Sequence, residues 1–190
     1  MHEKKIEGLL LQSTPYLGNK KILKVLTPDE GLLTLMTKQR TLEPFTHPFL
    51  IAEWVYRRGK GEIHSLIDAT LLNDLSHLRK DYTTLTIAGQ IAQDLLKTQW
   101  PEKPGSGPYL LASAFLQKLS LNPETLLASF RLKLLLHDGH IGEEALPFAQ
   151  EEQDVVHELT LTRQFSLLQN LKVEKGLQDK IEQLFYSLNS

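Results

Sequence analysis

The chain has 190 residues, of which 41% are hydrophobic and 23% charged, and its formal net charge is −2. This length and composition suit one large or two small globular domains. The absence of cysteine excludes disulfides and thiolate zinc sites and fits a reducing cytoplasm. Apolar runs stay far below the ~20 residues of a membrane-spanning helix, so we expect neither a membrane segment nor an export signal.

Charge is distributed unevenly along the chain. Residues 1–73 hold ten Lys/Arg against eight Asp/Glu, whereas residues 138–158 hold seven acids and neither Lys nor Arg. Outside this acidic segment the chain is mildly basic. Such a balance permits nucleic-acid binding but does not require it, because weakly basic solvated surfaces are common.

Residues 16–38 predict a β-hairpin. Apolar and polar residues alternate with a period near two over 22–27 and again over 32–37. Between them, Pro28 and Gly31 supply turn chemistry, because proline presets φ and glycine accepts a positive φ.

Three further strands are predicted over 6–13, 49–56 and 63–72, the last two joined by a glycine-containing connection at 57–62. Five short, mostly antiparallel strands favour a closed barrel such as an OB-fold, because closure removes exposed edges. The alternative is an open meander packed on the later helices. We therefore expect a barrel domain over residues 1–73.

After residue 73 the hydrophobic period changes to 3.6, which predicts an α-helical domain over 74–190. A short helix is expected at 74–78, and the segment 142–153 is expected to be a loop. Longer helices are predicted at 84–98, 109–119 and 123–137, with weaker candidates at 155–161 and 174–188. The third helix has Asn122 at its N-cap and Pro123 at its first position. The fold class is thus α+β, a five-stranded OB-like barrel followed by helices.

Basic side chains gather near the ends of the predicted strands, where phosphates could be bound. The DNA-binding candidates are Lys20, Lys21, Lys24, Lys38, Arg40, Arg57, Arg58 and Lys60. Tyr16, Trp54 and Tyr56 are aromatic residues on which bases could stack. In the alternative interpretation Trp54 and Tyr56 belong to the core, while Arg57 and Lys60 only solvate a turn.

The leucine-rich helix at 123–137 also carries basic residues. Lys118, Phe130, Arg131 and Lys133 are the partner-binding candidates, because a basic rim on an apolar groove suits an acidic peptide that ends in an aromatic residue. The equally open alternative is a buried helix whose Arg131 reaches water.

Enzymatic interpretations find little support in the sequence. His137, Asp138 and His140 have a spacing that could hold a metal, but a D-G-H segment more often ends a helix. No P-loop, dinucleotide-binding glycine motif or G-x-S-x-G nucleophile elbow is present. We expect no enzyme, no metal and no cofactor.

Five motifs occur in a characteristic order: GLLLQS, ILKVLTPDEGLLTLMTK, R-x-G-x-G-E at 57–62, ATLLNDLSHLRKD and LLASFRLKLLLHDGH. Their order and spacing resemble the RecO family of bacterial DNA recombination and repair proteins. The resemblance covers residues 1–140, with a fainter match from about residue 158 onward.

The resemblance implies a non-enzymatic mediator in the cytoplasm, associated with the nucleoid. Such a protein binds single- and double-stranded DNA and anneals complementary strands. With RecR it displaces single-strand-binding protein so that RecA can load, and it recognises the acidic C-terminal tail of single-strand-binding protein.

The chain departs from the family in two places. An acidic loop at 138–158 stands where many members carry a four-cysteine zinc ribbon, which implies a zinc-free variant. The loop after the third strand has only Lys38 and Arg40 as bases, which weakens the case for strong DNA binding by the barrel. The alternative function is therefore a protein–protein adaptor of the same fold with little intrinsic DNA binding.

Overall fold

The structure is a computed structural model that describes residues 3–37, 40–142 and 146–189, except for the side chains of residues 40 and 41. The chain divides into two compact units. The barrel unit comprises Met1–His77 and Leu95–Ser113, and the helical unit comprises Leu78–Asp94 and Ala114–Ser190. The expected division into a barrel domain over residues 1–73 and a helical domain over residues 74–190 stays a prediction.

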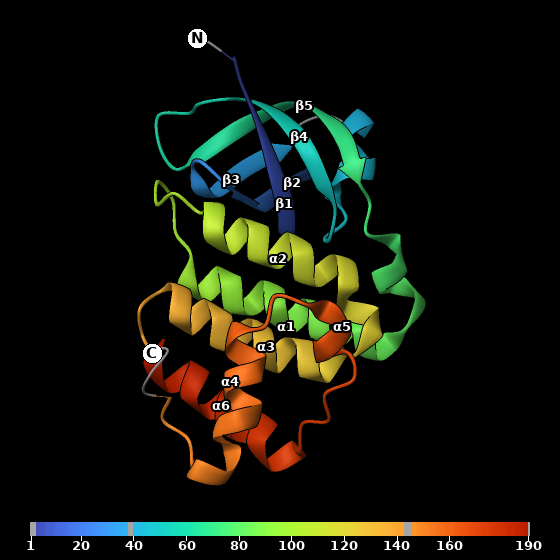
Figure 1. Cartoon of the computed structure of the whole chain (residues 1–190). Coiled ribbons are helices and arrows are strands. Elements are labelled where there is room, and N and C mark those ends of the chain that lie inside the picture. Colours follow the sequence, from blue (N-terminus) through green and yellow to red (C-terminus); the bar gives the residue numbers. More distant parts are fainter. Residues whose placement is uncertain (1–2, 38–39, 143–145, 190) are drawn as a thin grey trace. The chain divides into compact units, whose positions relative to one another are not determined.

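Five strands form a closed barrel in the barrel unit (Figure 1). They are β1 (Glu3–Tyr16), β2 (Lys20–Thr27), β3 (Gly31–Thr37), β4 (Ile51–Arg57) and β5 (Ile63–Asn73). Their order around the barrel is β1-β2-β3-β5-β4, and every neighbouring pair is antiparallel except β3 and β5. The predicted OB-like barrel is confirmed, and the open meander is wrong.

The barrel interior is filled by alternate side chains of the strands. Leu10, Leu23, Leu35, Trp54 and Tyr56 are all fully buried there. Because the side chains of a strand alternate between its two faces, the intervening positions of β2 and β3 point outward. A 3-10 helix, η1 (Arg40–Thr46), follows β3 and was not predicted from the sequence.

The predicted turn between β2 and β3 is confirmed and adopts a backbone conformation that favours glycine. Gly31 has φ +66°, and a Cβ atom there would lie 2.3 Å from the carbonyl oxygen of Lys103. Thr27 closes the turn by donating its hydroxyl to the Gly31 carbonyl at 2.9 Å. The Glu102 amide also donates to the Glu30 carbonyl at 3.1 Å, which ties the turn to the segment around residue 102.

Helices make up most of the remaining chain. The α-helices are α1 (Tyr82–Thr98), α2 (Ser106–Lys118), α3 (Pro123–His137), α4 (Gln153–Leu161), α5 (Phe165–Leu168) and α6 (Lys175–Leu188). The 3-10 helices η2 (Ser76–Lys80), η3 (Leu119–Leu121) and η4 (Gln150–Glu152) lie between them. Helix α3 is buried along most of its length and packs against α4, α5 and α6.

Two expectations need correction here. The acidic segment 138–158 is a loop only in part, because η4 and the first residues of α4 lie within it. Helix α5 was not predicted, since four residues are too few to show a hydrophobic period. None of the helices in the described part of the chain is both long and apolar enough to cross a membrane.

Candidate nucleic-acid interface

OB-folds bind oligonucleotides on the outer face of strands 2 and 3, between the β1–β2 and β4–β5 loops. In this barrel the face is framed by a continuous strand register. Ile22 on β2 pairs with Met36 on β3, Met36 pairs with Ser65 on β5, and Ser65 pairs with Arg57 on β4. The ends of the β4–β5 connection therefore border the same face as Lys24 of β2.

An aromatic ring and two cations meet at the β1–β2 end of this face. Tyr16 pairs with Lys20, and Pro15 pairs with Lys21, across the turn that joins the strands. Tyr16 is 45% exposed, and Lys20 is exposed without an ion-pair partner among the described residues. Lys20, Lys21 and Glu43 also border a hollow of about 450 Å³. A base on Tyr16 and a phosphate at Lys20 are chemically compatible with this arrangement.

Lys21 and Lys24 are already engaged with neighbouring side chains. The Lys21 ammonium donates to a carboxylate oxygen of Glu43 and, at 2.9 Å, to the Thr46 hydroxyl. This contact lowers the pKa of Glu43. The Lys24 ammonium lies 2.9 Å from the Thr34 hydroxyl on β3. Lys24 therefore lies on the outer face, whereas Lys21, which is in phase with Leu23 along β2, lies at the end of the barrel beside η1 and shares its charge with a carboxylate.

The β4–β5 connection carries the second group of cations. Arg57 Nη2 lies 2.9 Å from Glu3 Oε1, and Arg58 Nη2 lies 2.9 Å from Glu30 Oε2. Lys60 is exposed, with no ion-pair partner in the described part of the chain.

Glu30 joins three parts of the barrel unit. Its carboxylate accepts hydrogen bonds from Lys4 at 2.9 Å, from the Tyr56 hydroxyl at 2.7 Å and from Arg58. Although partial burial opposes ionisation, these donors together lower the pKa of Glu30 to about 2. Burial and the same carboxylate raise the pKa of Tyr56 to about 12. Glu30 is therefore ionised, and its negative charge neutralises part of the positive charge at this edge of the barrel.

Not all the predicted site residues belong to the face. Trp54 and Tyr56 are fully buried in the core, so they offer no surface for base stacking, and their interpretation as core residues is confirmed. Arg40 lies at the first position of η1, and its side chain is not described. Lys38 lies outside the described residues.

The carboxylates that pair with the predicted DNA-binding cations were not predicted from the sequence. Glu3, Glu30 and Glu43 each pair with one of the predicted DNA-binding cations. Only the strand register could have revealed the Glu3–Arg57 pair, because the two residues are 54 positions apart. Exposed pairs of this kind contribute about 0–1 kcal/mol, so a phosphate can displace the carboxylate at small cost.

The four partner-binding candidates lie in different environments. Phe130 is fully buried, and Arg131, which is 3% exposed, places Nε 2.9 Å from Asp94 Oδ2. The Lys133 ammonium donates to the carbonyls of Thr160 and Thr162 at the end of α4, and burial lowers the pKa of this lysine to about 8. Lys118 is exposed.

These four residues do not form a common exposed rim, and Arg131 does not reach out to water. Their part in partner binding stays a prediction. The three residues of the alternative metal site, His137, Asp138 and His140, lie near the end of α3. His137 Nδ1 lies 3.2 Å from Asp138 Oδ1, and His140 is exposed. Over residues 3–37, 40–142 and 146–189, no three His, Asp or Glu side chains are grouped so that they could hold a metal ion.

Comparison with known proteins gives a consistent result. No protein-family model matches the chain. The DNA repair protein RecO of Chlamydia pneumoniae is 28% identical over 221 residues, covering 96% of this chain and 87% of the relative. RecO of Chlamydia trachomatis serovar D is 25% identical, covering 97% and 92%. RecO of Caldicellulosiruptor bescii is 26% identical over 142 residues, covering 71% and 58%. The chain, which forms an OB-like barrel and a helical unit, is therefore a divergent relative of the RecO proteins.

Proposed function

We propose that this protein is a DNA-binding recombination mediator and annealing protein; its RecO relatives support a role in DNA repair. The observation that carries the proposal is that Tyr16, Lys20 and Lys24 lie on the face that OB-folds use for oligonucleotides, with Lys21 at the end of the barrel beside them. Arg58 and Lys60 add positive charge at the β4–β5 side.

Binding on this face would be weak and sensitive to salt. Each phosphate that a lysine or arginine neutralises releases counterions, so affinity falls as salt rises. At Lys21 and Arg58 a phosphate must first displace a carboxylate, which removes part of the gain. Lys20 and Lys60 have no such competitor among the described residues, and they would make the first contacts.

The partners proposed are single- and double-stranded DNA, RecR and single-strand-binding protein, including its C-terminal tail. Acting with RecR, the protein would displace single-strand-binding protein and promote RecA loading without a catalytic centre, in the cytoplasm at the nucleoid. The support for these partners is similarity to RecO over 96% of the chain.

A charge-reversal experiment tests the DNA site. The double variant Lys20→Glu with Lys21→Glu is compared with wild type in fluorescence anisotropy of labelled single-stranded DNA at two salt concentrations. The matched control is Lys172→Glu with Lys175→Glu, two exposed lysines of the helical unit. We expect affinity to fall at least tenfold in the first variant only, because two phosphate contacts become repulsive. Equal affinity in wild type and the first variant would remove the assignment.

One observation favours the second candidate function, a protein–protein adaptor with little DNA affinity. Three of the predicted DNA-binding cations, Lys21, Arg57 and Arg58, are paired with carboxylates. Absence of DNA binding even at low salt, together with binding of a peptide from the tail of single-strand-binding protein, would favour the adaptor.

A further inference from the structure

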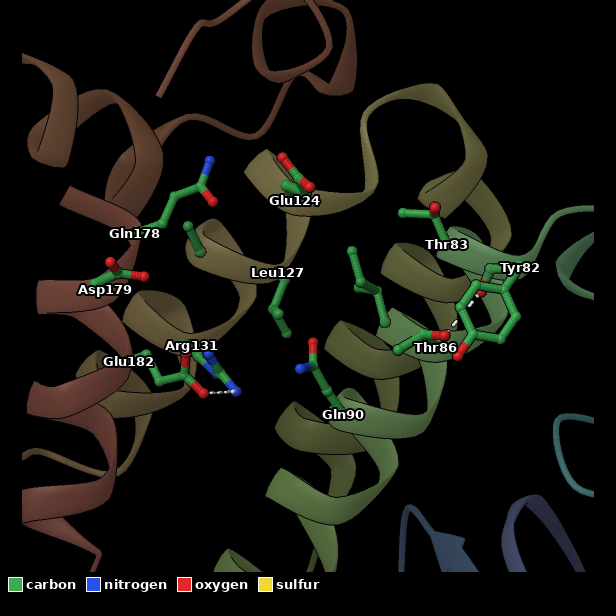
Figure 2. Close-up of a pocket in the computed structure, with 12 residues that line it drawn as sticks. Tyr82, Thr83, Thr86, Gln90, Glu124, Leu127, Arg131, Gln178, Asp179 and Glu182 are labelled. Carbon is green, nitrogen blue, oxygen red and sulfur yellow. Dashed lines mark hydrogen bonds and ion pairs between the residues drawn. The ribbon is translucent and has the colours of Figure 1, made fainter. Parts of the chain in front are cut away.

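In the helical unit, α3, α6 and residues 82–90 of α1 line a pocket of about 290 Å³. Its apolar floor consists of Ile87, Leu127 and Ala128, which are all buried. Figure 2 shows Leu127 of α3 in the middle of the pocket, between Gln90 and Thr86 of α1 and the side chains of α6. The pocket therefore offers an apolar base surrounded by polar groups.

Arg131 is the only basic residue that lines this pocket, and its charge is already balanced. Its Nε lies 2.9 Å from Asp94 Oδ2, and its Nη2 lies 3.1 Å from the Tyr186 hydroxyl and 3.6 Å from Glu182 Oε1. The ring of Tyr186 also lies 5.3 Å from the guanidinium carbon. Arg131 therefore has little positive charge to offer an incoming ligand.

The remaining charge of the pocket is negative. Glu124 in the first turn of α3 and Asp179 on α6 line it, and both side chains are exposed. Among the described residues, no ion pair involves Glu124 or Asp179. Glu182 adds a third carboxylate, which Arg131 neutralises only in part at 3.6 Å.

We propose that this pocket binds a Lys or Arg side chain presented by an exposed segment of a partner protein. The aliphatic stem of such a residue would cover Leu127 and Ala128, and its cationic head would lie beside Asp179 and Glu124. Charge complementarity selects this occupant, because an acidic peptide would meet unpaired carboxylates of its own sign. The inference goes beyond the proposed function, since none of these residues belongs to the barrel.

The direct test uses a fluorescein-labelled peptide, Leu-Ala-Arg-Ala-Leu, capped at both ends, and the full chain. We expect saturable binding that weakens about tenfold in Asp179→Asn with Glu124→Gln, because two charge-assisted contacts are lost. The matched control, Glu151→Gln with Asp154→Asn, removes the same charge from exposed positions that do not line the pocket, and it should bind like wild type. The peptide Leu-Ala-Gln-Ala-Leu should bind at least tenfold more weakly than the arginine peptide.

A second variant tests the same site by adding charge instead of removing it. Thr83→Lys introduces a cation at an exposed rim position of α1, so we expect it to weaken the arginine peptide about as much as the double variant. Three results would overturn the proposal: equal weakening in the control variant, equal affinity for the glutamine peptide, or displacement of the arginine peptide by an acidic peptide that ends in phenylalanine. DNA binding by the barrel should be the same in all these variants, so a failure here leaves the proposed function to its own test.

Discussion

Both the barrel unit and the helical unit contain ion pairs between an arginine and a carboxylate, but these pairs lie in opposite environments. Arg57 and Arg58 pair with Glu3 and Glu30 on a surface open to water, and their side chains are 44% and 49% exposed. Arg131, by contrast, pairs with Asp94 at the same 2.9 Å distance, but these side chains are 3% and 0% exposed.

This difference separates replaceable charge from structural charge. In water, an exposed pair is worth about 0–1 kcal/mol, so a competing anion can take the place of the carboxylate. A buried charge that loses its partner is neither paired nor hydrated. This lowers the free energy of unfolding by about 3–5 kcal/mol. The arginines of the barrel are therefore available to a ligand, whereas the guanidinium of Arg131 is engaged in a buried ion pair of the helical unit.

The largest expected effect is the loss of the buried pair. Replacing Arg131→Met removes the guanidinium that pairs with the buried carboxylate of Asp94 and should lower the free energy of unfolding by about 3–5 kcal/mol. Arg58→Met on the barrel is the matched control and should cost far less, because its ion pair with Glu30 is exposed to water. Equilibrium unfolding in urea measures both, and similar losses in the two variants would contradict the distinction.

The next effect concerns the exposed aromatic residue on the barrel. Tyr16→Ala should weaken single-stranded DNA binding by about 1–3 kcal/mol, because one stacking platform is removed. Tyr82→Ala, which removes an exposed tyrosine of the helical unit, is the control and should leave DNA affinity unchanged. Fluorescence anisotropy with a short labelled oligonucleotide gives both affinities; equal effects would argue against Tyr16 as a base contact.

A pH titration examines the exposed network around Glu30. Its pKa falls from an ordinary 4.5 to about 2 in the folded protein, so its ion pairs contribute full stability above about pH 4.5. That contribution should decline as the pH falls toward 2, where the folded-state carboxylate takes up a proton. Glu30→Gln should remove this part of the pH dependence in urea unfolding measured between pH 5 and 2. An identical pH profile in wild type and variant would contradict it.

The smallest effect is the release of one lysine. Glu43→Gln removes the carboxylate that Lys21 contacts, and we expect a small rise in DNA affinity, because an exposed ion pair in water is weak. Glu151→Gln changes the net charge equally at an exposed position of the helical unit and serves as the control. A gain of the same size in both would show that only net charge matters.

Much of the barrel could be predicted from the sequence because its strands are amphipathic. Alternation over 22–27 and 32–37 predicted β2 and β3, and Pro28 and Gly31 predicted the turn between them. The 3-10 helix η1 carries Pro44 and lacks a clear period, so the sequence offered no signal for it.

The pairing of charges could not be predicted in the same way. Arg131 and Asp94 are 37 residues apart on different helices, and only tertiary packing brings them together. Because this pairing could not be predicted, Arg131 was expected to contribute a cation to the predicted basic rim. Likewise, Glu43 lies beside Lys21 because the 3-10 helix η1, which contains Glu43, follows β3 and packs near the start of β2.

The salt dependence of single-stranded DNA binding tests the central claim most directly. The logarithm of the affinity is plotted against the logarithm of the salt concentration for wild type and for Lys20→Ala with Lys21→Ala. If both lysines contact phosphates, the slope should become shallower by about 0.7 for each contact, or about 1.4 in total. An unchanged slope and an unchanged affinity would contradict the claim that this face of the barrel binds DNA.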